Sequence, residues 1–165
     1  MPEPTSWVPL ARVLLVKLVD FLPKFLVKRL YPREALAAHI DLDLSIPAGM
    51  EFALYGVPRV YLYVRITNRS PYMDIEVDRL HADIWDNQPL ATAASHDVIT
   101  VPRCSRSEDF ASGNELNEFQ VRKIREVAKT RDPRFKAYLK ATLNTSLGRI
   151  EIKKTIEAIP TRITG

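Results

Sequence analysis

The chain has 165 residues, of which 46% are hydrophobic and 27% are charged, and it contains only five glycines. This length suits one domain with a sizeable core, and this composition excludes a low-complexity or disordered chain. The formal net charge of +4 favours acidic partners such as phospholipid headgroups, and residues 1–32 carry +3 of that charge.

The first predicted element is an amphipathic helix over Trp7–Leu30, with a kink at Pro23. At about 100° per residue, the apolar side chains fall on one broad arc and the charged side chains on the other. We therefore predict a helical appendage over residues 1–37 and a β-sandwich domain over 38–165. The residues expected to contact a membrane or a partner are Trp7, Leu14, Lys17, Leu18, Phe21, Leu22, Lys24, Phe25 and Lys28.

A helix with leucine and aromatic residues on one face and lysines on the other is typical of an interfacial membrane anchor. Burying its large apolar side chains would gain on the order of 10 kcal/mol before ordering costs. An anionic lipid surface is the favoured partner, and the protein's own sheet, another protein or a second copy are open alternatives. The charged residues interrupt the apolar stretch, which argues against a spanning helix and against a secretory signal.

The body of the chain shows apolar residues at every second position, which predicts half-buried strands. Strands are expected over residues 40–46, 60–67, 75–84, 90–94, 97–101, 135–143 and 150–158. A bulge is expected near Asp78-Arg79, a turn at Gln88-Pro89 and a hairpin loop over 144–148. The pattern predicts an all-β fold, an antiparallel β-sandwich of about seven strands.

Two segments of the body depart from this alternation. Residues Glu115–Arg131 favour a short helix that ends before Asp132-Pro133, although Phe119-Gln120-Val121 also fits a strand. Residues Arg103–Leu116 are interpreted as a loop that is longer than a plain sandwich needs.

The stretch VRITNRSP, at residues 64–71, ends a predicted strand in an asparagine and a proline-bearing turn. The motifs NQPLA at 87–91 and ITVP at 99–102 follow, with a closing hairpin that contains Gly148. Over residues 38–160 this pattern resembles the second group of late embryogenesis abundant proteins, the water-stress and hypersensitive-response domain. Asn68 and Pro71 are expected to shape the strand-ending turn.

The resemblance implies an immunoglobulin-like or fibronectin-III-like β-sandwich without enzymatic activity. It also implies a role in stress protection, such as protection of membranes or proteins during desiccation. The N-terminal amphipathic segment is not part of the domain pattern, so it leaves room for a specialised tethering or assembly role.

The polar residues do not have the spacing of a catalytic or ligand-binding motif. His39, His81 and His96 lie outside any HExxH or Cys/His pattern, and Cys104 is single, which fits a reducing compartment. Tyr61, Tyr63 and Arg65 are interpreted as cross-strand packing rather than a nucleic-acid surface. We therefore expect no enzyme activity, no cofactor, no metal and no nucleic-acid partner.

Taken together, these patterns predict a non-enzymatic module for binding or stress protection. The module is expected in the cytoplasm, peripheral to the inner face of a membrane, with its basic amphipathic helix on the lipid. The alternative is a structural subunit whose N-terminal helix docks on a partner protein or on a second copy, which would give an oligomer.

Overall fold

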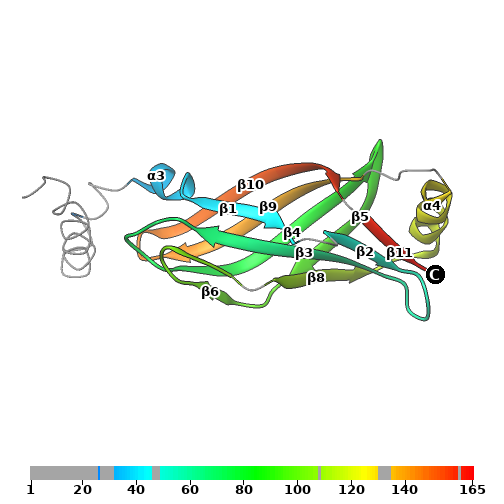
Figure 1. Cartoon of the computed structure of the whole chain (residues 1–165), viewed down its shortest axis with the longest axis horizontal. Coiled ribbons are helices and arrows are strands. Elements are labelled where there is room, and N and C mark those ends of the chain that lie inside the picture. The colour runs from blue at the N-terminus through cyan, green and yellow to red at the C-terminus, as the bar shows by residue number, and fades with distance from the viewer. Residues whose placement is uncertain (1–25, 27–31, 46–48, 108, 130–134, 160) are drawn as a thin grey trace, which may run out of the picture.

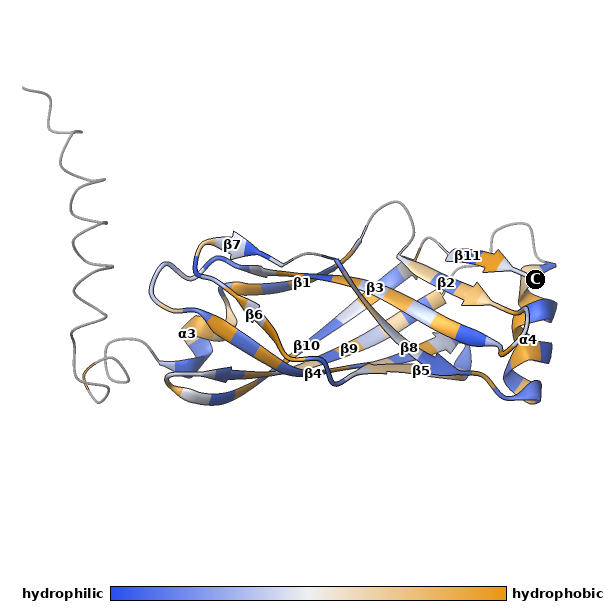
Figure 2. Cartoon of the chain, turned by 90° about the horizontal axis from the view of Figure 1, so that it is seen from below, coloured by the Kyte–Doolittle hydropathy of each residue, from blue (hydrophilic) through white to orange (hydrophobic). Residues whose placement is uncertain are grey.

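The computed structural model describes residue 26 and residues 32–45, 49–107, 109–129, 135–159 and 161–165 (Figure 1). Most of these residues belong to strands, and the strands form two sheets that pack face to face, as Figure 2 shows edge on. Along β3 (Arg59–Asn68) every second residue is buried, as expected for a strand with one face on a core. The prediction of an all-β sandwich is confirmed at this level.

The first sheet is built around β3. On one edge of β3 lie β1 (Ile40–Leu44) and β2 (Met50–Ala53), and on the other lie β7 (Ser105–Arg106) and β8 (Phe110–Glu115). The register fixes this arrangement, because Leu62 pairs with both Met50 and Ser112, while Val64 pairs with both Leu44 and Phe110. The short strand β11 (Thr161–Thr164) adds to β2 in parallel.

The second sheet is built around β4 (Ile75–Asp86). One edge of β4 pairs with β9 (Phe135–Thr145), and the other edge pairs with β5 (Gln88–Ser95) and β6 (Ile99–Val101). The strand β10 (Gly148–Ile159) forms a hairpin with β9. The register of β4 against β9 shifts between Val77 and Arg79, which confirms the predicted bulge.

The core fills the space between the two sheets with inward-facing residues from both. Phe52 of the first sheet and Phe135 of the second meet edge to face, with ring centroids 5.3 Å apart. The largest fully buried side chains are Phe52, Phe135, Leu36, Leu42, Met50, Leu62, Ile66, Ile75, Leu80, Ile84, Ile124 and Leu139.

Two helices lie at opposite ends of the sandwich (Figure 1). The helix α3 (Arg33–Ala37) buries Leu36 completely, and α4 (Glu118–Ala128) buries Ile124 completely. A capping box begins α4, in which Asn117 and Gln120 satisfy each other's main-chain N–H groups. The predicted helix within residues 115–131 is thus confirmed over 118–128.

The edges of the two sheets are joined by Lys154 of β10. Its ammonium lies 2.7 Å from an Asp41 carboxylate oxygen and 3.0 Å from one of Asp43, both on β1. Partial burial disfavours the charged ammonium, but the hydrogen bonds to the two aspartates outweigh it and raise the pKa of Lys154. The first and the second sheet therefore share an ion pair where β1 and β10 approach each other.

Some details of the sequence prediction were wrong. Residues 103–116 are not one long loop, because they contain β7 and β8. The inward-facing residue at the middle of β8 is Ser112, and a polar residue at that position hides the alternation that marks a strand. The turn expected at Gln88-Pro89 is made by Asn87, whose φ is 51°, and Gln88 already belongs to β5.

Candidate functional site

The residues predicted to contact a membrane or a partner lie outside the described residues, so their roles stay predictions. They are Trp7, Leu14, Lys17, Leu18, Phe21, Leu22, Lys24, Phe25 and Lys28. The chain enters the described body at Pro32, immediately before α3. No helix among the described residues is long and apolar enough to cross a membrane.

The helix α3 is fixed to the end of the sandwich by packing and by hydrogen bonds. Leu36 is fully buried in the shared core, and the Nε atom of Arg33 donates to the Leu147 carbonyl oxygen at 3.2 Å. Leu147 lies in the turn between β9 and β10, and Gly148 follows it with a φ of 107°, where glycine is favoured. The entry of the chain is therefore held against the β9–β10 turn.

Asn68 is the last residue of β3 and its side chain is fully buried at the same end of the molecule. Its Nδ2 group donates to the carbonyl oxygens of Met73 at 3.0 Å, Val101 at 3.2 Å and Pro102 at 3.2 Å. Its Oδ1 atom accepts the Ser70 main-chain N–H at 3.0 Å. One amide therefore ties together the turn after β3 and the turn after β6.

Pro71 continues the turn that Asn68 begins, and it is half-buried. Ser70 and Tyr72 flank Pro71 in the sequence, and the buried Ser70 hydroxyl accepts a hydrogen bond from the Tyr72 main-chain N–H at 3.2 Å. These bonds satisfy main-chain donors that would otherwise be buried without partners. The turn is thus a fixed structural element.

The tyrosines of β3 lie on the solvent side of the first sheet, where each is half-buried. The Tyr63 hydroxyl donates to Glu51 of β2 at 3.2 Å, and burial followed by the charge of Glu51 raises the pKa of Tyr63. The ring of Tyr61 covers Gly113 of β8, where an added Cβ would lie 3.0 Å from it. Both side chains thus make cross-strand contacts, as predicted.

Asp109 links two strands of the first sheet. It accepts hydrogen bonds from Arg65 Nε at 2.6 Å and Arg65 Nη2 at 2.8 Å, and a further one from the Ser45 hydroxyl. The Arg65 guanidinium, and then the Ser45 hydroxyl, hold the pKa of Asp109 below its ordinary value. This contact secures the segment between β7 and β8 to β3.

Imidazole and carboxylate groups that lie together can bind metals, and His81 lies beside a carboxylate. His81 Nε2 lies 3.1 Å from Asp83 Oδ1, and these two side chains are 41% and 48% exposed. Within the described residues, no three His, Cys, Asp or Glu side chains come together as a metal-binding group. His81 and Asp83 form a surface pair on β4.

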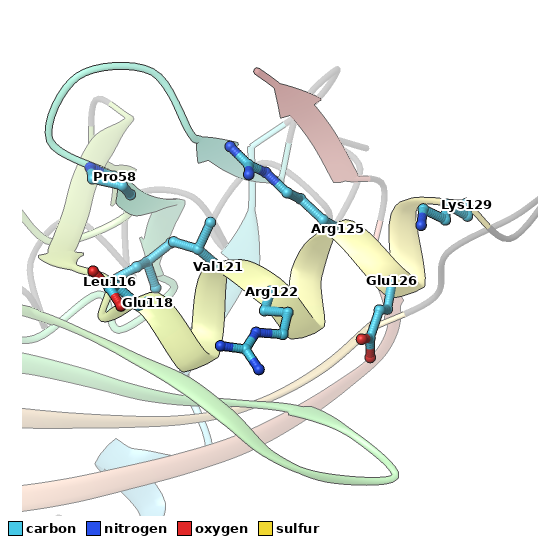
Figure 3. A pocket seen from close by; sticks show the side chains of 8 residues that line it. All are labelled: Pro58, Leu116, Glu118, Val121, Arg122, Arg125, Glu126 and Lys129. Carbon is cyan, nitrogen blue, oxygen red and sulfur yellow. The ribbon is translucent and has the colours of Figure 1, made fainter.

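A groove of about 470 Å³ lies beside α4 (Figure 3). Its lining mixes apolar and charged side chains from Pro58, Leu116, Glu118, Val121, Arg122, Arg125, Glu126 and Lys129. In Figure 3 the guanidinium groups of Arg122 and Arg125 point to different sides of α4. The basic groups therefore do not converge on one ligand position.

A second groove, of about 750 Å³, lies between β8 and the end of β5. Arg59 in its wall pairs with Glu115 at 2.9 Å, and the hydrogen bonds to Glu115 and then Tyr61 raise the pKa of Arg59. Asp97 accepts the Ser95 hydroxyl at 3.3 Å. These polar groups of the second groove satisfy each other, as is usual on a solvated face.

No family model matches the chain, and no curated protein matches it. Among solved structures, the chain is similar to the Northeast Structural Genomics Consortium target SoR45, with 13% identity and a TM-score of 0.46 over 73% of this chain and 86% of that one. It is also similar to a protein from Archaeoglobus fulgidus, with 13% identity and a TM-score of 0.40 over 72% of this chain and 94% of that one. The sporulation control protein Spo0M of Bacillus subtilis gives 9% identity and a TM-score of 0.36, over 74% of this chain and 48% of that one. These similarities carry no argument about function.

Proposed function

We propose that the protein is a non-enzymatic, membrane-peripheral module for binding or stress protection, held on anionic lipid by its N-terminal segment. The apolar side chains of Trp7, Leu18 and Phe21 enter the headgroup boundary, while Lys17 and Lys24 meet the anionic lipid. The β-sandwich then stands on the surface with its loops available to a partner. This places the protein in the cytoplasm, at the inner face of a membrane.

The observation that carries this proposal is that the described body buries its apolar residues within itself. The inward faces of both sheets meet in one core, and α3 and α4 add Leu36 and Ile124 to it. The exposed large apolar residues of the described part are scattered over two loops, α4 and β9: Tyr55, Val57, Val98, Phe119 and Tyr138. Single exposed apolar residues are normal, and these five do not make one continuous face.

The consequence concerns the apolar arc of the N-terminal segment. That arc gains on the order of 10 kcal/mol on burial before ordering costs, so it requires a cover. Because the described body offers no continuous apolar face to it, the cover lies outside the body. A lipid surface is preferred to a protein surface because five of the seven charges in residues 1–32 are basic.

The finer assignment of the fold belongs to the same proposal. Since β1 and β2 share one edge of β3, β7 and β8 share the other, and β5 and β6 share one edge of β4, each of these pairs acts as a single interrupted strand. This grouping supports a fibronectin-III-like or immunoglobulin-like sandwich of about seven strands. It is compatible with the resemblance to the second group of late embryogenesis abundant proteins.

The test is co-sedimentation with vesicles of phosphatidylcholine and phosphatidylserine. The full chain is expected to pellet with them, and the double variant Leu18→Glu with Phe21→Glu is expected to stay in the supernatant with an unchanged melting temperature. A lowered melting temperature would instead place these side chains in the core. Light scattering of the same two proteins identifies the alternative, since a dimer that the double variant abolishes would favour a structural subunit.

A further inference from the structure

Five arginines gather at the α3 end of the sandwich, on four segments that are far apart in the sequence. We call this surface the arginine end: Arg33, Arg69, Arg103, Arg106 and Arg149. The segments contact one another. The Arg69 main-chain N–H donates to the His39 carbonyl oxygen at 2.8 Å, and the Cys104 main-chain N–H donates to the Ser70 carbonyl oxygen at 3.1 Å. The Arg33 side chain donates to the Leu147 carbonyl oxygen.

The arginine end carries more basic than acidic side chains. Residues 33–165 contain 19 basic and 18 acidic side chains, so the body as a whole is nearly neutral. The segments 32–39, 69–74, 102–107 and 145–149 contain the five arginines and two carboxylates, Glu34 and Asp74. Two further carboxylates, Asp41 and Asp78, lie within 4.0 Å of arginines of this end. Asp74 already accepts the Arg103 main-chain N–H at 2.9 Å. Basic side chains therefore outnumber the carboxylates at this end of the body.

Two of these arginines have only loose ion pairs. Arg69 lies 3.5 Å from Asp41 and its side chain is 68% exposed, while Arg149 lies 4.0 Å from Asp78 and is 63% exposed. Exposed pairs at such distances contribute little, so the guanidinium groups can exchange their partner. A phosphate group is a suitable new partner, because guanidinium binds it through two parallel hydrogen bonds.

The length of the chain between the N-terminal segment and the body decides which end faces the membrane. Five peptide units separate Lys28, the last residue of the predicted lipid contact, from Arg33. Even a fully extended chain spans roughly 17 Å over that distance. If Lys28 meets the headgroups, the arginine end must lie close to the lipid surface.

The opposite end of the molecule lies much farther from that surface. The strand β4 has 12 residues and runs between the two ends, which corresponds to roughly 40 Å. Charges are screened over about 8 Å at physiological ionic strength, so the α4 end is electrostatically independent of the α3 end. This separation supplies a control surface within the same chain.

We infer that the arginine end is a second lipid contact, which binds the phosphates of anionic phospholipid headgroups and orients the sandwich upright on the membrane. This inference rests on the proposed function, because it requires an N-terminal segment that lies on lipid. It adds that the body contributes its own electrostatic contact, independent of the apolar insertion.

The experiment measures binding of the full chain to vesicles of phosphatidylcholine with phosphatidylserine, in titrations at two salt concentrations. The test variant combines Arg69→Gln, Arg106→Gln and Arg149→Gln, and the control combines Arg122→Gln, Arg125→Gln and Lys129→Gln at α4. All six side chains are exposed, and each variant loses three positive charges. Each positive charge near the lipid surface raises the affinity about fivefold, so the test variant should bind about a hundredfold more weakly than the wild type. Its binding should also depend less on salt. The control should bind like the wild type.

The outcomes separate the inference from the proposed function. Equal weakening in both variants, or no weakening in the test variant, overturns the arginine contact while leaving the apolar insertion standing. Retained binding in Leu18→Glu with Phe21→Glu, or no binding by the wild type, overturns the proposed function and the inference with it. A variant with lysine at the same three positions should recover most of the binding. That recovery would exclude misfolding as the cause of the weaker binding. A test variant that loses affinity for generic RNA but keeps its affinity for vesicles also overturns the inference.

Discussion

Asn68 donates from its buried side-chain amide to the Met73 carbonyl oxygen at 3.0 Å, across the turn that follows β3. The same amide reaches the turn after β6 through Val101 and Pro102. The buried Asn68 side chain therefore connects two turns at the α3 end of the molecule. This makes it a rigid end on which exposed arginines can be displayed.

The first prediction concerns this amide. Asn68→Ala leaves buried carbonyl groups without their donor, and it should lower the free energy of unfolding by about 2–3 kcal/mol. Asn114→Ala is the matched control, because Asn114 is exposed and makes only a long contact of 3.4 Å to Thr92. The control should change stability by less than about 0.5 kcal/mol. Urea denaturation measures both, and equal effects would contradict the role of Asn68.

The second prediction compares two serines that are both fully buried. The Ser112 hydroxyl has no hydrogen-bond partner among the described residues, whereas the Ser70 hydroxyl accepts the Tyr72 N–H. Ser112→Ala should leave the stability unchanged or raise it by about 1 kcal/mol, because it removes an unsatisfied polar group. Ser70→Ala should lower the stability by about 1–2 kcal/mol. Thermal denaturation measures both changes in stability. A larger loss of stability for Ser112→Ala than for Ser70→Ala would show that the Ser112 hydroxyl has a partner.

The third prediction concerns the end that α4 closes. Ile124 is fully buried, so Ile124→Ala should lower the free energy of unfolding by about 2–4 kcal/mol. Phe119 lies on the same helix but is 60% exposed, and Phe119→Ala should cost less than about 0.5 kcal/mol. If both substitutions had the same small effect in chemical denaturation, α4 would be a surface appendage rather than part of the core.

The fourth prediction follows from the depressed pKa of Asp109, which Arg65 and then Ser45 produce. A carboxyl whose folded pKa lies below its unfolded value of 3.8 stabilises the protein above that value, and the stabilisation is lost as the pH falls through the folded pKa. Wild type should therefore be more stable than Asp109→Asn near neutral pH, and the difference should shrink below about pH 4. The other carboxyls are common to both proteins and cancel in this difference. A difference that stays constant in urea denaturation from about pH 6 to about pH 2 would contradict the assignment.

The sequence predicted the long strands in which apolar residues alternate over many positions, but it missed the four-residue strand β2, although Met50 and Phe52 face inward there. The alternation of Val60, Leu62, Val64 and Ile66 in β3 sets both its limits and its buried face. The phase change around Asp78 likewise revealed the bulge of β4, since a shift of one residue moves every later side chain to the other face. Such local patterns are visible without knowledge of the partner strand.

Elements that depend on distant partners could not be predicted in this way. The strand β11 has only four residues and forms through its parallel pairing with β2, more than 100 residues earlier in the chain. The helix α3 has five residues, and Leu36 marks it only through its burial against the end of the sandwich. The strand β8 carries a serine at the inward position where the pattern requires an apolar residue.

The arginine end was also invisible in the sequence. Members that follow one another in the sequence are up to 43 positions apart, from Arg106 to Arg149, and the near-neutral body hides their concentration in any average. Only the pairing of β3 with β1 and β7, together with the β9–β10 turn, brings them to one end. The available signal was that Arg69, Arg103, Arg106 and Arg149 fall in or next to a predicted turn or loop.

The most direct measurement for the proposed lipid contact is the fluorescence of Trp7. The chain contains two tryptophans, and Trp85→Phe leaves Trp7 as the single reporter while keeping an aromatic ring beside Tyr138. On addition of vesicles that contain phosphatidylserine, we expect the Trp7 emission to move to shorter wavelength and to be quenched by brominated acyl chains. An emission that is already at short wavelength in the lipid-free monomer, and that vesicles leave unchanged, would show that the protein covers this face itself and would contradict the membrane attachment.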